Sequence, residues 1–161
     1  MSKDDKIVPI EERIAQLFGR GAGFCDVRGG NPELTPADIS RAIGKVAIEH
    51  GNWVAMVLET KYGSTLMHER ELCKGWETFA RQHDPDTAKE IIAFRRHACI
   101  LAVHELATGQ KASRQIFERA AWLLCVRRAA LEAAAWLIWT WFDDLARDGR
   151  KTFCAQFKNA A

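Results

Sequence analysis

Residues 129–145 form a nearly continuous apolar segment with helical character. A helix that is apolar on almost every side is usually buried on most of them. Glu132, Asp143 and Asp144 interrupt the segment, and it is shorter than the roughly 20 apolar residues that a membrane span needs. The segment therefore predicts a helix packed among other helices, and no association with a membrane.

Two interpretations of this segment remain open at the level of the sequence. In the first, it is the central helix of the core. In the second, part of its surface is an interface in a homodimer or with another protein, because aromatic residues are favoured at the centre of such interfaces. The interface residues would then be Trp136, Trp139 and Trp141.

Apolar residues recur at helical spacing through most of the remaining chain, and no segment alternates as a half-buried strand does. The length of 161 residues suits one domain. We therefore predict an all-α fold, a compact bundle of five or six helices in a single domain over residues 1–161. The expected helices are about 10–18, 35–62, 66–82, 85–107, 112–124 and 127–147.

Glycine, proline and capping residues predict where these helices begin and end. Residues 1–34 are expected to form a short helix and a glycine-rich loop, which carries no phosphate-binding motif. Thr35 should cap the next helix, and Gly51 is a weak point within it. Gly63 is the expected left-handed residue at its end, and Gly109 should end a later helix.

Composition narrows the class of protein but does not define an activity. Apolar residues make up 48% of the chain and charged residues 27%, which excludes a disordered or fibrous protein. The five cysteines form no CxxC motif, so we expect free thiols in the cytoplasm. The histidines and carboxylates show neither metal-ligand spacing nor a catalytic motif. We expect no enzyme activity, no metal and no cofactor.

Residues 112–147 have the pattern of a helix-turn-helix pair, in which the start of the second helix enters the major groove of DNA. Such a pair needs a small residue where the helices cross and apolar residues around the turn. The residues at these positions are Ala121, Leu124, Cys125, Val126, Leu131 and Ala134. Cys125 falls where glycine is usual, because the backbone there is left-handed.

Basic residues surround this predicted pair. Residues 111–161 carry 9 Lys and Arg against 5 Asp and Glu, whereas residues 1–110 carry 14 against 16. A basic region of this kind favours a partner such as double-stranded DNA. The residues expected at base edges are Arg127, Arg128 and Glu132, and those expected at phosphates are Lys111, Arg114 and Arg119. The alternative is a plain helical hairpin, with Arg127 and Arg128 as the solvated start of a core helix.

The segment from Val103 to Lys111, the predicted pair and the segment from Trp141 to Leu145 together resemble the C-terminal half of phage late-gene antitermination proteins of the Q type. The resemblance covers about residues 98–148 and concerns layout more than identical residues. Cys125 in the turn departs from the family pattern. The resemblance implies a small helical protein that binds DNA beside a promoter and makes RNA polymerase ignore terminators.

Overall fold

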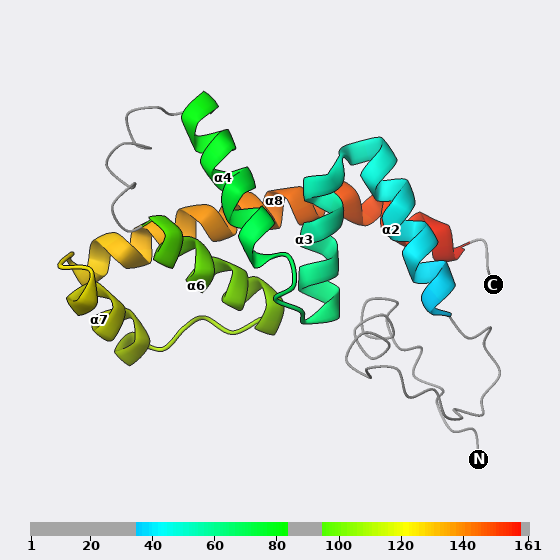
Figure 1. The fold of residues 1–161 in the computed structure, drawn as a ribbon. Helices are drawn as coiled ribbons and strands as arrows, with labels where there is room; N and C mark the ends of the chain where they lie inside the picture. Colours follow the sequence, from blue (N-terminus) through cyan, green and yellow to red (C-terminus); the bar gives the residue numbers. More distant parts are fainter. Residues whose placement is uncertain (1–34, 84–94, 159–161) are drawn as a thin grey trace, which may run out of the picture.

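The computed structural model describes residues 35–83 and 95–158. This part of the chain is entirely α-helical, as the sequence predicted, and the six helices pack against one another (Figure 1). The helices are α2 (Pro36–His50), α3 (Asn52–Gly63), α4 (Glu69–His83), α6 (Arg95–Thr108), α7 (Arg114–Leu123) and α8 (Arg128–Lys158).

The long helix α8 is the central helix of the fold. It runs along the molecule from α7 to α2 and packs against α2, α3, α6 and α7 (Figure 1). The side chains of Leu131, Ile138, Phe142 and Phe153 are fully buried on its inner side. The apolar segment at residues 129–145 is therefore the central helix of the core, while part of its outer side stays exposed.

Gly149 allows α8 to approach α3 closely. A Cβ atom at this position would overlap the side chain of Val54 and lie 2.9 Å from Leu58 Cδ1, which is closer than side-chain atoms approach. Gly149 therefore serves packing inside the helix, and α8 continues past it. The prediction that this helix ends at residue 147 was wrong, because Phe153 and Phe157 extend its buried face for about three more turns.

The predicted helix 35–62 is divided at Gly51. This residue has φ of 93°, a left-handed value that glycine adopts without strain, and it separates α2 from α3. Thr35 caps α2 as expected, in a capping box with Asp38. The left-handed residue after α3 is Ser64, with φ of 48°, so the prediction of Gly63 in this role was wrong.

Gly109 ends α6 with φ of 68°, as predicted. The expected helix at residues 10–18, the glycine-rich loop and the first part of the expected helix 85–107 lie outside the described residues. Among the helices that are described, none combines the length and the hydropathy that a membrane span requires.

Candidate nucleic-acid interface

Helix α7, the turn at residues 124–127 and the first turns of α8 form a helical hairpin at one end of the molecule (Figure 1). Helix α7 packs mainly against α8. The hairpin therefore projects from the bundle, where another macromolecule can approach it.

The turn of the hairpin is a Schellman motif, a common way to end a helix with one left-handed residue. The amide of Val126 donates to the carbonyl of Ala121 at 3.0 Å, and the amide of Cys125 donates to the carbonyl of Trp122 at 3.2 Å. Cys125 is the left-handed residue, with φ of 53°. The sequence had predicted the left-handed backbone at this residue.

The positions predicted for helix-turn-helix packing point inward. Ala121 is buried where α7 meets α8, and Leu131 and Ala134 are buried on α8. Leu124 and Val126 flank the turn and pack against the core in partly buried positions. The hairpin thus has the packing that the residue pattern called for.

Arg127 stands at the point where α8 begins. Its carbonyl accepts the first backbone bonds of the helix, from Ala130 at 3.0 Å and Leu131 at 3.2 Å. An arginine side chain has no hydrogen-bond acceptor, so it cannot cap the free amides of this helix start. Amides at a helix N-terminus, together with an exposed guanidinium, suit a phosphate oxygen.

Four of the residues around the hairpin form a charge cluster, Arg114 and Glu118 on α7 and Arg128 and Glu132 on α8. The Nε of Arg114 lies 2.6 Å from Glu118 Oε1, and the Nη1 of Arg128 lies 3.3 Å from Glu132 Oε1. Both pairs are one helical turn apart within their own helix.

The two pairs also interact across the hairpin. The hydrogen bond and attraction from Glu118 raise the pKa of Arg114, and attraction from Glu132 acts in the same direction. The hydrogen bond from Arg114 lowers the pKa of Glu118, and attraction from Arg128 adds to this. Arg114, Arg128 and Glu132, three residues predicted to contact DNA, therefore lie in one cluster.

Lys111, Arg119 and Arg127 are exposed outside this cluster. The Nζ of Lys111 lies 6.0 Å from the centre of the Phe117 ring. Arg119 follows Arg114 by five residues, so it points about 140° further round α7. The structure therefore does not bring all the predicted phosphate contacts to one face. In the described part of the chain, no ion pair involves Arg119 or Arg127.

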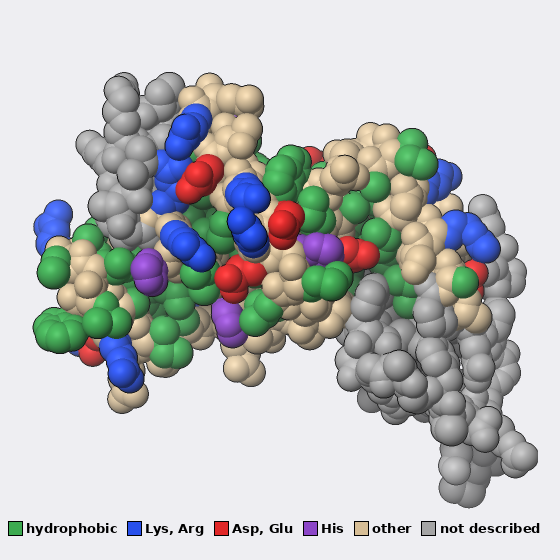
Figure 2. Space-filling model, viewed as in Figure 1, with side chains coloured by type: hydrophobic (Ala, Val, Ile, Leu, Met, Phe, Trp, Pro, Cys, Tyr) green, Lys and Arg blue, Asp and Glu red, His purple; other side chains and the backbone are tan. Residues whose placement is uncertain are grey.

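The hairpin also exposes large apolar side chains. Trp122 is 78% exposed, Leu123 66% and Trp136 61%. Figure 2 shows hydrophobic and basic side chains together at the α7 end of the molecule. Sequence reasoning overlooked Trp122 and Leu123, although both fall outside the face of α7 that is marked by the buried Phe117 and Ala121.

The other two tryptophans of α8 lie closer to the core. Trp139 is partly buried, and Trp141 packs against α4, with its ring centre 5.7 Å from that of Trp76 and 5.1 Å from that of Phe79. Of the three tryptophans predicted at an interface, Trp136 is the most exposed.

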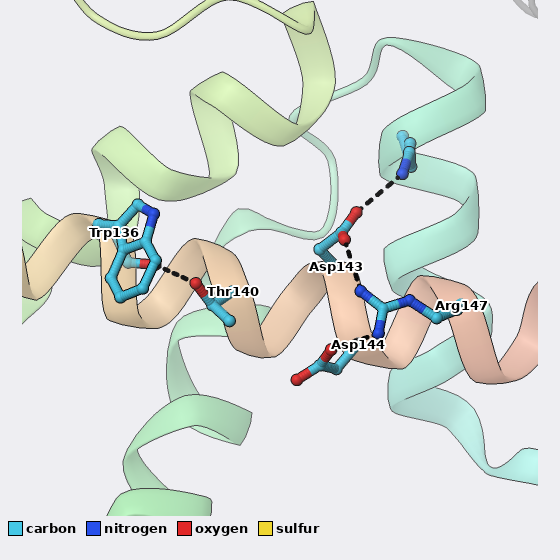
Figure 3. A network of polar contacts seen from close by, with 6 residues as sticks. Trp136, Thr140, Asp143, Asp144 and Arg147 are labelled. Atoms are coloured by element: carbon cyan, nitrogen blue, oxygen red, sulfur yellow. Dashed lines mark hydrogen bonds and ion pairs between the residues drawn. The ribbon is translucent and has the colours of Figure 1, made fainter.

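Beyond Trp136 the outer side of α8 becomes polar (Figure 3). Asp143 lies 3.1 Å from Lys61 Nζ on α3 and 3.2 Å from Arg147 Nη2. Arg147 also pairs with Asp144. The pair of Lys61 with Asp143 connects α8 to α3, whereas the pairs of Arg147 lie within α8. The large exposed apolar side chains of α8 therefore lie at the hairpin end of the helix.

Residues 35–83 and 95–158 contain no group of three His, Cys, Asp or Glu side chains that is close enough to hold a metal ion. A histidine and a carboxylate do meet as a pair: His68 Nε2, just before α4, lies 2.5 Å from Glu59 Oε2 on α3.

Comparisons of the chain with known protein families, with curated proteins and with solved structures found no match.

Proposed function

We propose that the protein is a DNA-binding transcription regulator that contacts duplex DNA with the α7–α8 hairpin. The observation that carries the proposal is the turn at Cys125, whose left-handed backbone lies between helices packed through Ala121 and Leu131. This is the arrangement that a helix-turn-helix reader needs. The hairpin projects from the bundle, and the residues from Lys111 to Glu132 include five Lys and Arg against two Glu.

In this proposal, the first turn of α8 enters the major groove. Arg127 and Arg128 contact base edges, with Glu132 beside them, because guanidinium groups suit guanine and a carboxylate can accept from cytosine. Lys111, Arg114 and Arg119 contact phosphates, which set the position of the protein on the duplex.

The proposal is tested by fluorescence anisotropy with labelled mixed-sequence duplex DNA at about 50 and 200 mM salt, because phosphate contacts weaken steeply over this range. We expect salt-sensitive binding that Arg127→Ala weakens. Arg70→Ala, which removes an exposed arginine on α4, is the control and should leave the affinity unchanged. Binding that is absent at the lower salt concentration would contradict the proposal.

Once a preferred site has been selected, Arg128→Ala should cost roughly 1–3 kcal/mol of specific binding if Arg128 reads a base. An unchanged affinity for the correct site would remove Arg128 from this role.

The resemblance to phage antitermination proteins supports a narrower version of the proposal, in which the DNA-bound protein acts on bacterial RNA polymerase. Transcription in vitro from a template with a terminator downstream of the selected site tests this version. Increased readthrough that depends on that site would support it. Site binding without readthrough would leave a DNA-binding regulator of another kind.

A second candidate function is a protein-interaction module, which the exposure of Trp122, Leu123 and Trp136 favours. Several large apolar side chains exposed at one end of a molecule are typical of a site that binds another protein. If the chain forms a homodimer there, sedimentation velocity should show a dimer that Trp122→Ala or Trp136→Ala dissociates. An apolar dimer should persist at high salt, whereas DNA binding should not.

A further inference from the structure

The charge cluster contains an arrangement that simple DNA binding does not need. A surface that only attracts DNA would leave its arginines free. Here, Arg114 and Arg128 are each paired with a carboxylate one turn further along the same helix, at 2.6 and 3.3 Å. Each carboxylate thus takes one of the five N–H donors of its guanidinium in the free protein.

We propose that Glu118 and Glu132 compete with DNA for Arg114 and Arg128, and so lower the affinity of the hairpin for DNA that lacks the preferred base sequence. This inference rests on the proposed DNA binding. When an arginine contacts a phosphate or a guanine, its attraction to the carboxylate is weakened or lost, and the carboxylate is brought near the negatively charged backbone. Both effects oppose binding wherever the DNA does not offer enough contacts to offset them.

The exposure of the pairs fits this role. The side chains of Arg128 and Glu132 are partly buried, whereas Arg114 is largely exposed. Ion pairs in such settings are weak enough for a ligand to break. Arg127 is exposed at the start of α8 and lies outside the cluster, so DNA can contact it while the pairs are still closed.

The pairing also provides selectivity. Non-specific binding depends almost entirely on phosphate contacts, so losing the contribution of two arginines lowers it directly. A correct base sequence can compensate, because a bidentate contact from Arg128 to guanine is stronger than its single bond to Glu132.

The experiment measures the affinity of the full chain for labelled mixed-sequence duplex DNA by fluorescence anisotropy at about 50 mM salt. Glu132→Gln and Glu118→Gln keep the size of each side chain and remove its charge. We expect each to tighten binding roughly twofold to fivefold relative to the unmodified protein. Asp148→Asn is the control, since it removes an exposed carboxylate from α8 about 24 Å further along the helix.

A double-mutant cycle separates competition for the arginine from a general change in charge. In the Arg128→Ala background, Glu132→Gln should tighten binding no more than Asp148→Asn does. The inference is wrong if Glu132→Gln tightens DNA binding as much in the Arg128→Ala background as it does in the unmodified protein. It is also wrong if Glu132→Gln alone tightens binding no more than Asp148→Asn does.

The failure of this inference differs from the failure of the proposed function. Salt-sensitive binding by the unmodified protein with no extra gain in either Gln variant overturns competition and leaves DNA binding in place. Binding that appears only in the Gln variants supports competition but contradicts the proposed function, because the unmodified protein then does not bind DNA at the lower salt concentration. If neither the unmodified protein nor the variants bind at the lower salt concentration, both proposals are wrong.

Discussion

Gly149 of α8 lies so close to Val54 of α3 that a methyl group in place of its hydrogen would overlap the valine side chain. Val54 is buried and β-branched, so it has little freedom to turn away. This approach is what allows the C-terminal part of α8 to pack against α2 and α3.

Gly149→Ala should therefore destabilise the protein even though alanine is the better helix former. Overpacking costs about 1–3 kcal/mol, and the gain in helix propensity offsets up to about 1 kcal/mol of it. We expect the free energy of unfolding, measured by chemical denaturation, to fall by about 1–2 kcal/mol.

The matched control for this prediction is Gly44→Ala in α2, where a Cβ would meet nothing within 4 Å. This substitution should raise the free energy of unfolding by about 0.5–1 kcal/mol. If both variants gained stability, the close approach at Gly149 would not be a constraint on the fold.

Cys125→Gly should stabilise the turn of the hairpin. A left-handed residue other than glycine costs roughly 1–2 kcal/mol, and glycine adds some entropy to the unfolded chain. The expected net gain in the free energy of unfolding is about 0.5–1 kcal/mol. Gly109→Ala is the reverse substitution, because it places a residue other than glycine at a φ of 68°. It should lower the free energy of unfolding by about 1 kcal/mol. A loss of stability in Cys125→Gly would argue against a left-handed turn.

Asp143 should make the stability of the protein depend on acid pH. Burial alone would raise the pKa of this carboxyl, but hydrogen bonds and attraction from Lys61 and Arg147 lower it below the ordinary value of 3.8. A carboxyl whose pKa is lower in the folded state stabilises the fold above its unfolded pKa. That contribution disappears as the pH falls through the folded pKa.

Thermal unfolding of the unmodified protein and of Asp143→Asn checks this prediction. The difference in stability between the two should be present at pH 7 and should shrink as the pH falls below about 4. A difference that is constant across this range would mean that the charge of Asp143 does not act through Lys61 and Arg147.

Thr35→Ala should lower the free energy of unfolding by about 1 kcal/mol, because it removes the side-chain cap of α2. Thr35 Oγ1 accepts from the Asp38 amide at 3.2 Å, and the Thr35 amide donates to the Asp38 carboxylate at 3.0 Å. Thr35→Ser keeps the cap and should cost much less. Equal losses in the two variants would contradict a role for the cap.

Local signals predicted much of this fold. Thr35, Gly51 and Gly109 begin or end helices, and these roles depend only on residues close to them in the sequence. They could therefore be inferred from the sequence. The left-handed backbone at Cys125 was predicted because the buried residues on both sides of the turn define where it must lie. The role of Gly149 was not predicted, because it depends on Val54, which lies far away in the sequence and next to it only in the fold.

The candidate site was less predictable for the same reason. The sequence indicates which residues around the hairpin are charged, but not that Arg114, Glu118, Arg128 and Glu132 lie in one cluster. That arrangement depends on how α7 crosses α8. The exposure of Trp122 likewise depends on how much of α7 its neighbours cover.

Helix α8 has a consequence for any partner that binds the hairpin. It is one uninterrupted helix of 31 residues, about 46 Å long. The hairpin forms around its first residues, and α2 packs near its far end. A partner that holds the start of α8 at a defined angle therefore also determines the direction in which α2 and α3 face. As a single rigid helix, α8 sets both the distance and the orientation between the hairpin and the surface of α2 and α3 at the opposite end of the molecule.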